Sequence, residues 1–365
     1  MTAMRYVLQI NTGNAQTPTL TAGEAERILT AWLEKLPVDT VIYGWARDPA
    51  VNRAVISTAR ENGAKAYAWL PVFAENPYPG EKIVPIVPGG DTGIRIVEGE
   101  NFEFCCPGSE AALDGAKRFL ADIAGYAEPD GVFLDRIRYP SAAVPNALYG
   151  CFCPRCLARY EKMGIDTDRL RYEARMGNTR PFVPESFSAG RYRFADTDID
   201  RLFAVKRNTV SASVGKLAAY IHGKGLEVGL DLFAPALADL VGQDIRLLAS
   251  CAEMVKPMMY FSTFAPAGLP FEVGALNAEM RERLAIIWNG RPDSEETMLS
   301  QLSLLSETGC TVAAGIEVNP ISGICGTDRE TVSRRLRVLA EAGYGQAALC
   351  WNIAAGSALM PDADI

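Results

Sequence analysis

The sequence predicts a single (β/α)₈ barrel, and three features lead to this prediction. Eight short β-rich segments alternate with helical segments along the whole chain. The apolar runs of these segments are nearly continuous, as expected when a parallel strand is covered on both faces. The length of 365 residues suits a barrel with long loops, since such barrels span about 250 to more than 400 residues.

The predicted strands are rich in Val, Ile, Leu and aromatic residues. They are Arg5–Asn11, Thr40–Trp45, Lys65–Phe73, Gly131–Tyr139, Leu226–Phe233, Met254–Phe261, Thr311–Asn319 and Gln346–Asn352. Eight parallel strands that each lead into a helix can close into a barrel. An open doubly wound sheet would instead need a glycine-rich phosphate turn after the first strand, and NTGNAQTP does not supply one.

Helix start and stop signals separate the strands. Thr21 followed by Glu24 forms a capping box, which opens a helix that runs to about Lys35. Asp48 before Pro49 is typical of an N-cap followed by proline at the first helical position. The glycines expected to end a helix just before the next strand are Gly63, Gly223, Gly309 and Gly343.

One apolar segment, Leu284–Trp288, fits either a ninth strand or the end of a helix that begins near Phe271. We favour the helix, because Asn289 and Gly290 resemble its C-terminal cap. The chain is then one barrel domain over residues 1–365, with loop insertions at about 74–108 and 140–198. Both insertions follow strand C-termini, where barrel enzymes hold their active sites.

Composition excludes several classes of protein. Hydrophobic residues make up 48% and charged residues 22%, as in a globular protein with a large core. A net charge of −8 with no run of Lys or Arg argues against nucleic acid and anionic membranes as partners. No segment approaches the roughly 18 apolar residues of a membrane span, and the N-terminus lacks a secretory signal pattern. Nine cysteines suit a reducing compartment, so we expect a cytoplasmic protein.

The single histidine, His222, lies at a helix C-terminus that leads into the N-terminal end of a strand, away from the catalytic face. A positive group near a helix C-terminus is the simpler interpretation of that position. Histidine-based nucleophilic, metal and base catalysis are therefore disfavoured. The remaining candidates for general acid–base catalysis are carboxylates, Tyr, Lys and Cys.

Three acidic residues lie late in predicted strands: Asp135 in GVFLDRIRYP, Asp231 in VGLDLFAP and Glu317 in VAAGIEVN. Gly229 lies two residues before Asp231, and Gly315 lies two residues before Glu317. These glycines leave room for large neighbours inside the barrel. A carboxylate pair that flanks a bond suits glycosidic cleavage, with one group protonated and the other acting as nucleophile or base. We expect Asp135 and Glu317 to be the working pair and Asp231 to orient substrate or tune a pKa.

The alternative for each carboxylate is a structural network with Arg136, Arg138 or Lys256. Lys256 itself lies inside the sixth predicted strand, in MVKPMMY. A desolvated lysine in a barrel can form a Schiff base, as in class I aldolases. A salt bridge from Lys256 to Asp231 is the interpretation we favour.

Aromatic and polar residues recur at the strand ends that carry the acidic residues. Sugar rings stack their C–H faces on aromatic side chains, and amides or guanidinium groups bond their hydroxyls. The candidate substrate-binding residues are Tyr43, Trp45, Trp69, Arg138, Tyr139, Lys256, Tyr260, Asn319, Trp351 and Asn352. Core packing is the alternative for each aromatic residue taken alone.

The segment CFCPRC places Cys151, Cys153 and Cys156 just before a predicted helix. Three thiols at this spacing resemble part of a tetrahedral zinc site. Cys105 or Cys106 of FEFCCPGSE is the expected fourth ligand, which would join the two insertions through a structural zinc. Unligated thiols are the alternative. The other cysteines, namely Cys251, Cys310, Cys325 and Cys350, look like ordinary small buried residues.

The run DGVFLDRIRYPS, followed by CFCPRCLARY, resembles the DG-x-x-x-D-x-I-R-Y-P signature of bacterial glycoside-hydrolase-like (β/α)₈ proteins. Many of these proteins also carry a CFC-x-x-C segment in the loop after that strand. The Cys106-Pro107 pair, the GLDLF strand and the closing LCWNI are similar too. The resemblance implies a glycosidase in which Asp135 matches the strand-four aspartate and Arg138 the arginine after it. The assignment of Glu317 rests on its position late in a strand and not on a motif match.

We therefore expect a hydrolase of O-glycosyl bonds that acts on an oligosaccharide or small glycoside and needs no organic cofactor. Two alternatives remain open. One is a Schiff-base lyase or aldolase that uses Lys256, and the other is a sugar-binding barrel without catalysis.

Overall fold

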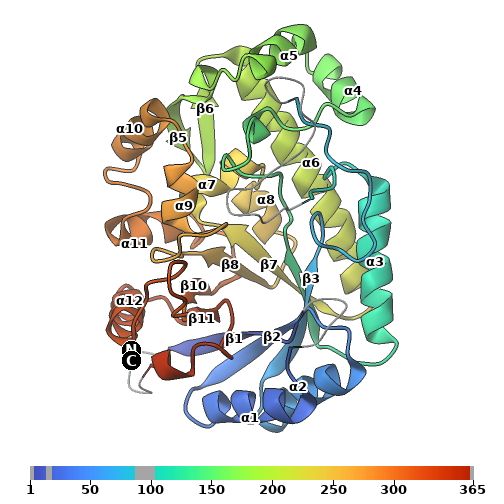
Figure 1. Ribbon diagram of the computed structural model, residues 1–365, viewed down its shortest axis with the longest axis vertical. Coiled ribbons are helices and arrows are strands. Elements are labelled where there is room, and N and C mark those ends of the chain that lie inside the picture. The colour runs from blue at the N-terminus through green and yellow to red at the C-terminus, as the bar shows by residue number, and fades with distance from the viewer. Residues whose placement is uncertain (1–3, 14–18, 87–102, 362–365) are drawn as a thin grey trace.

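A computed structural model describes residues 4–13, 19–86 and 103–361 of the chain. Its main sheet is a closed ring of parallel strands in the order β10-β11-β1-β2-β3-β4-β7-β8-β9, with a further pairing between β10 and β8 that closes the ring (Figure 1). The strands are β1 (Arg5–Asn11), β2 (Val38–Gly44), β3 (Lys65–Pro71), β4 (Gly131–Asp135), β7 (Glu227–Phe233), β8 (Met254–Met258), β9 (Thr311–Val312), β10 (Ala314–Glu317) and β11 (Gln346–Cys350).

The predicted (β/α)₈ barrel is confirmed, and every strand of the barrel lies within a segment predicted from the sequence or overlaps it closely. The segment Thr311–Asn319 forms two short pieces, β9 and β10, which occupy one position in the ring. The predicted strands extend past the observed ones mainly at their C-terminal ends. These extra residues belong to the loops at the C-terminal ends of the strands.

Helices surround the barrel strands (Figure 1). The long ones are α1 (Ala22–Leu33), α2 (Pro49–Glu61), α3 (Glu110–Ala124), α6 (Thr197–His222) and α12 (Arg329–Glu341). Shorter ones are α7 (Pro235–Ala238), η4 (Asp239–Val241), α8 (Ile245–Ala249), α9 (Leu269–Gly274), α10 (Ala278–Ile287), η5 (Glu295–Thr297), α11 (Met298–Leu302) and η6 (Ser357–Leu359). The Thr21 capping box of α1 and the Asp48 N-cap of α2 are both present.

Two of the four glycine stops are as expected. Gly63 and Gly343 follow α2 and α12 with positive φ angles of 76° and 84°, which favour glycine. Gly309 also has a positive φ of 76°, but it does not end a helix, because α11 ends at Leu302 and turns and bends fill residues 303–310. Gly223 differs, because it caps α6 with a right-handed φ of −62° and Gly225 takes the left-handed position instead.

The ambiguous segment Leu284–Trp288 is helical, as predicted, and forms the end of α10. Asn289 has a positive φ of 50°, and the Gly290 N–H donates to the Ala285 carbonyl at 2.9 Å, which closes the helix. The expected single helix from near Phe271 is instead two helices. They are separate because Asn277 caps a new helix start by accepting from the Met280 N–H at 2.8 Å.

The two insertions extend from the strand C-termini. The described ends of the first, residues 74–86 and 103–108, are joined by isolated bridges from Ala74 to Phe104 and from Lys82 to Cys105. The second contains η2 (Ala147–Tyr149), α4 (Pro154–Lys162), α5 (Thr167–Arg175), η3 (Arg180–Phe182) and the antiparallel pair β5 (Pro184–Ser188) and β6 (Arg191–Phe194). Its aromatic rings pack on the barrel helix α6, with the Phe194 and Phe203 centroids 4.6 Å apart.

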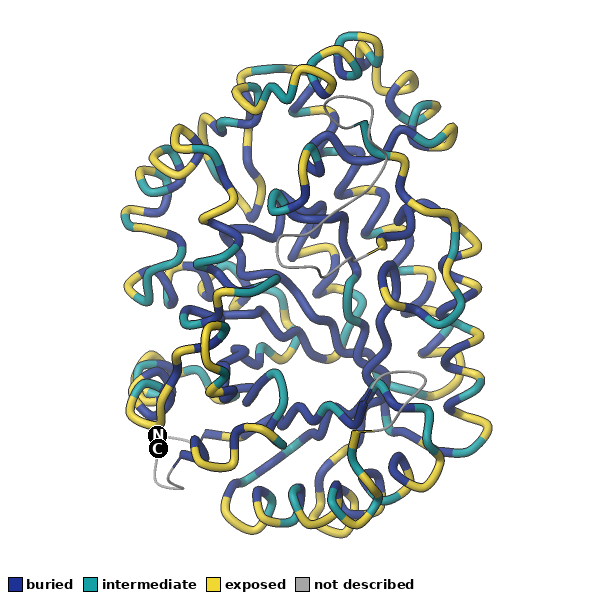
Figure 2. Tube along the Cα trace, in the orientation of Figure 1, coloured by how far each residue is buried: buried dark blue, intermediate teal, exposed yellow. Residues whose placement is uncertain are grey.

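The barrel interior is filled by large side chains opposite glycines, and its strands are buried along most of their length (Figure 2). A Cβ atom at Gly229 would lie 2.7 Å from the Phe133 ring. A Cβ at Gly315 would lie 3.5 Å from Lys256 Cγ. The missing side chains therefore make room for the interior residues that support the site. Within the described residues, no helix is both long enough and apolar enough to cross a membrane.

Candidate active site

A cavity of about 420 Å³ opens where the barrel strands end at their C-termini. Its volume falls in the range of small-molecule sites, about 300–1,000 Å³. The lining residues are Gln9, Asn11, Trp45, Trp69, Glu75, Asp135, Arg136, Arg138, Asp231, Met258, Tyr260, Thr263, Ala265, Pro266, Ala267 and Trp351. The cavity therefore lies at the end of the barrel where the sequence predicts the acidic candidate residues. His222 lies at the opposite end, where it contacts Glu253 at 3.1 Å.

Asp135 ends β4 and is held at the mouth of the cavity by two N–H donors. The Trp69 indole N–H donates to Asp135 Oδ2 at 3.0 Å. The Arg136 backbone N–H donates to Oδ1 at 2.5 Å. Because β4 and β7 are neighbouring strands, Asp135 and Asp231 approach the same cavity from adjacent positions in the ring.

Asp231 lies in β7, is 4% exposed and lines the cavity below its mouth. Its Oδ2 atom is 3.1 Å from Lys256 Nζ, and its Oδ1 atom has no hydrogen-bond partner among the described residues. Burial raises the pKa of Asp231 to about 7; Lys256 opposes this shift and the neighbouring Asp135 charge adds to it. This carboxyl group can therefore hold a proton near neutral pH.

Lys256 lies beside Asp231, at the paired position of the neighbouring strand β8, and is fully buried. Its ammonium group also donates to Gln9 Oε1 at 3.0 Å and to the Tyr260 hydroxyl at 2.8 Å. Burial alone would lower the pKa of Lys256, but the charges of Asp231, Cys350 and Asp135 together with the hydrogen bond to Asp231 outweigh it, and the pKa is raised. The salt bridge to Asp231 that we favoured is present. Lys256 is not among the lining residues of the cavity, so it supports the site through its contact with Asp231.

Glu317 is placed differently from the other two carboxylates. It is fully buried, but it does not line the cavity. Its Oε2 atom is 2.9 Å from Arg335 Nη1 of α12, and its Oε1 atom accepts from the Ser262 backbone N–H. Burial raises the pKa of Glu317, and Arg335 opposes that shift. The expected convergence of three carboxylates is therefore met only by Asp135 and Asp231.

We expect the Glu317–Arg335 pair to act on stability. Arg335→Met should lower the free energy of unfolding by about 3–5 kcal/mol, because it leaves a buried carboxylate without its counter-ion. Arg334→Met is the matched control, since Arg334 pairs with Glu295 as Arg335 does but its side chain is 49% exposed. Its loss should change stability by about 1 kcal/mol or less. Urea unfolding measures both, and equal small losses would contradict the structural role.

The predicted substrate-binding residues divide into two groups. Those that line the cavity are Trp45, Trp69, Arg138, Tyr260 and Trp351. The Trp45 and Trp69 rings lie 4.8 Å apart and form an aromatic wall. Those that do not line it are Tyr43, Tyr139, Lys256, Asn319 and Asn352.

The second group has structural contacts instead. Tyr139 is fully buried, and its ring lies 5.5 Å from the Lys206 ammonium group. The Asn319 side chain accepts from the Trp351 backbone N–H at 2.8 Å and donates to the Asn352 carbonyl at 2.9 Å. Asn319 therefore fixes the backbone next to Trp351, which does line the cavity.

Several lining residues were not proposed from the sequence. Gln9 gave a usable signal, because it is the polar residue in the otherwise apolar run YVLQI. Glu75 and Arg136 form an ion pair at the mouth of the cavity, and both have positive φ angles, 56° for Glu75 and 54° for Arg136. Thr263 and the segment 265–267 belong to an irregular loop after β8. Loop conformation of this kind has no periodic sequence pattern.

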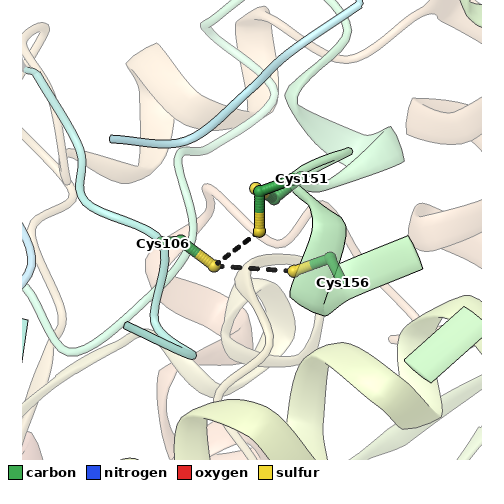
Figure 3. Close-up of side chains that lie close together, drawn as sticks. Cys106, Cys151 and Cys156 are labelled. Atoms are coloured by element: carbon green, nitrogen blue, oxygen red, sulfur yellow. Dashed lines mark hydrogen bonds between the residues drawn. The ribbon is translucent and has the colours of Figure 1, made fainter. Parts of the chain in front are cut away.

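Four cysteines form a second cluster, apart from the cavity lining. The Sγ atoms of Cys106, Cys151, Cys153 and Cys156 all lie within 4.8 Å of one another. Figure 3 shows Cys106 pointing at Cys151 and Cys156, and its Sγ is 3.5 Å from that of Cys156. Zinc–sulfur bonds of about 2.3 Å give a tetrahedron with edges of about 3.8 Å. The cluster therefore fits a metal with four thiolate ligands.

The structure also separates the two candidates for the fourth ligand. Cys106 belongs to the cluster, whereas Cys105 Sγ accepts from the Gly80 backbone N–H at 3.1 Å. Cys105 and Cys106 are adjacent in an extended segment, so their side chains point in opposite directions.

No protein-family model matches this chain, and no curated protein matches it. Several solved structures, however, are similar to this chain. The PgaB (BpsB) glycoside hydrolase domain from Bordetella bronchiseptica aligns over 96% of this chain and 95% of its own, with a TM-score of 0.59 and 15% identity. α-L-Fucosidase isoenzyme 2 from Paenibacillus thiaminolyticus aligns over 98% of this chain, with a TM-score of 0.53 and 12% identity. The alignment covers 48% of that second chain.

At these identities the likeness establishes the shared fold. The chain is thus a (β/α)₈ barrel with an aromatic-lined cavity at the C-terminal ends of its strands, and three acidic side chains, Glu75, Asp135 and Asp231, line that cavity.

Proposed function

We propose that the protein is a glycoside hydrolase that cleaves an O-glycosyl bond in an oligosaccharide or small glycoside. The observation that carries this proposal is the pair Asp135 and Asp231, which face one cavity from neighbouring strands. Most glycoside hydrolases cleave a glycosidic bond with two carboxyl groups that lie on either side of it. The structural relatives support the proposal, since one is described as a glycoside hydrolase domain and another as a fucosidase.

The two carboxyl groups take different roles in this proposal. Asp231, with a pKa raised to about 7 by burial, is the general acid that donates a proton to the leaving oxygen. Lys256 lies against it and holds it in place. Asp135, oriented by Trp69 and the Arg136 backbone, is the nucleophile or the base for an attacking water. The sequence had suggested Asp135 and Glu317 as the working pair. We propose Asp231 in place of Glu317, because Glu317 does not line the cavity.

Aromatic side chains supply the binding surface for the sugar. Trp45, Trp69, Trp351 and Tyr260 line the cavity around the two carboxyl groups. Their rings present apolar faces to the C–H faces of a pyranose ring. The Trp69 indole N–H is already bonded to Asp135, and the Tyr260 hydroxyl accepts from Lys256, so these two polar groups orient the site.

A panel of aryl glycosides, each in both anomeric forms, tests the proposal directly. Release of the aryl group by the wild-type protein, and its loss in Asp135→Asn, would support hydrolysis. Sugar binding without turnover across the panel would instead indicate a binding protein. A Schiff-base lyase is disfavoured, because the Lys256 pKa is raised and its ammonium group is bonded on three sides. Trapping of a substrate adduct with borohydride would reverse that conclusion.

The role of Asp231 as acid predicts a specific pH dependence. Since the protonated form is needed and its pKa is about 7, kcat/KM should fall as the pH rises through about 7. Aryl glycosides with very acidic leaving groups need little protonation, so their kcat/KM should stay nearly flat over the same range. Rate–pH profiles for the two kinds of substrate measure this difference. Identical profiles would show that another group controls the fall.

We also propose that the four-cysteine cluster holds a structural zinc ion. The ligands would be Cys106 from the first insertion and Cys151, Cys153 and Cys156 from the second. Bound zinc would cross-link these insertions and takes no part in the proposed hydrolysis. Thiolate ligands need a reducing compartment, which agrees with the cytoplasmic location that we propose from the cysteine content.

A further inference from the structure

Arg138 is the feature of the cavity that the proposed hydrolysis leaves unexplained. It follows β4 by three residues, is 6% exposed and lines the cavity. Its guanidinium group lies 4.9 Å from the Phe104 ring centroid and 4.3 Å from that of Phe233. Two aromatic rings therefore hold it in place and exclude water from its surroundings.

The hydrogen bonds of Arg138 leave much of its donor capacity unused. In the described residues its side chain makes one, from Nη1 to the Tyr139 carbonyl at 3.1 Å. A guanidinium group carries five N–H donors in a planar fork. The remaining donors belong to a side chain on the cavity wall, where a ligand can accept from them.

The charge of Arg138 also lacks a direct counter-ion. Arg136 is paired with Glu75, and Asp231 with Lys256. The charges of Asp135 and Asp231 act on Arg138 through space, but among the described residues neither forms an ion pair with it. Glu272 interacts with Arg138 through space, but among the described residues no ion pair joins them. Glu272 Oε1 instead accepts from the Ala267 backbone N–H at 2.9 Å. A buried cation without a direct counter-ion is unfavourable unless an anion pairs with it.

We infer that the cavity takes a glycoside that carries an anionic group, and that Arg138 binds this group. This substrate class rests on the proposed function. A carboxylate or a phosphate ester on the sugar ring shares the required chemistry, because each offers two oxygens to the guanidinium fork. A neutral sugar would leave the cation unpaired. Arg138 is thus a specificity-determining residue, distinct from the carboxyl pair that carries out hydrolysis.

Matched substrates test the inference. Aryl hexosides, the corresponding aryl hexuronides and the aryl hexoside 6-phosphates are compared in both anomeric forms. We expect the wild-type protein to favour one of the anionic series in kcat/KM. Arg138→Gln should reduce activity on that series by about 10- to 100-fold, as expected for a charge-assisted hydrogen bond, and change activity on the neutral series much less. Whichever anionic series is favoured identifies the group.

Two further variants keep the result interpretable. Arg138→Lys retains the charge without the planar fork, so its loss on the anionic substrate should be intermediate. Arg207→Gln is the control, because Arg207 is similarly buried but pairs with Asp239 outside the cavity lining. It should leave the ratio of anionic to neutral activity unchanged. Wild-type binding of the anionic sugar should also weaken as salt is added.

Direct binding separates this inference from the proposed function. Calorimetry with free hexuronates, hexose 6-phosphates and neutral hexoses needs no turnover. Binding of an anionic sugar that Arg138→Gln abolishes, without hydrolysis of any glycoside, would support the anion site and overturn the hydrolase proposal. Hydrolysis of neutral glycosides, with no preference for anionic ones and no effect of Arg138→Gln, would overturn the anion site alone.

Discussion

Asp135→Asn should reduce kcat by about 10²- to 10⁴-fold on any glycoside that the wild-type protein hydrolyses. Asp135 lies at the cavity mouth with both oxygens held by N–H donors, from Trp69 and from the Arg136 backbone. The amide of asparagine has nearly the same shape, but it can neither attack an anomeric carbon nor accept a proton from water. Steady-state kinetics and a thermal melt on the same preparation measure the loss and confirm folding.

Asp231→Asn should lower kcat by a similar factor, most strongly on substrates with poor leaving groups. It should also destabilise the protein, because it leaves the fully buried Lys256 without its counter-ion. Asp239→Asn is the matched control. Asp239 is as buried as Asp231 and is paired with Arg207, but it does not line the cavity. A stability loss without a loss of kcat is expected there, and equal catalytic losses in both variants would remove the special role of Asp231.

The fold could be predicted from the sequence because its signals are local. Each strand is a short apolar run, and caps such as Thr21 and Asp48 act within one helical turn. The salt bridge between Lys256 and Asp231 was also predictable. Both residues interrupt apolar strands that are neighbours in a barrel, and a buried charge needs a partner.

The position of Glu317 could not be predicted in the same way. Strand alternation puts it in phase with Gly315, whose Cβ position faces Lys256 and Tyr260. Its carboxylate nevertheless turns to Arg335, a residue of the next helix. That choice depends on where α12 packs and how a long side chain is rotated. Neither is encoded in the spacing of residues along the strand.

The cavity residues that lie in irregular loops could not be predicted either, because their positions depend on the loop conformation. Glu75 and the segment 265–267 reach the cavity through backbone conformations that include positive φ angles at Glu75 and Ala267. Non-glycine residues rarely adopt such angles, so the sequence gives no warning of them. The aromatic residues at strand ends were better guides, since Trp45, Trp69 and Trp351 all line the cavity.

Removal of the proposed zinc should also have a large effect, and it should act first on stability. Zinc in a site with four thiolates contributes on the order of 10 kcal/mol to local structure. The cluster joins Cys106 of the first insertion to the segment Cys151–Cys156 of the second. We therefore expect a chelator to lower the melting temperature by several degrees or more, at about 2–4 °C per kcal/mol for a domain of some 150–250 residues.

The same treatment should raise KM more than it lowers kcat. Cys106 lies two residues after Phe104, whose ring packs on the Arg138 guanidinium group, whereas Asp135 and Asp231 lie in the barrel strands. Cys156→Ser should reproduce the effect, and Cys310→Ser, at a half-buried thiol outside the cluster, should not. Elemental analysis of protein purified under reducing conditions should find one zinc ion per chain. Because four mutually close thiolates without a cation would repel one another, metal-free protein with unchanged stability would mean that these cysteines are protonated and serve only as packing.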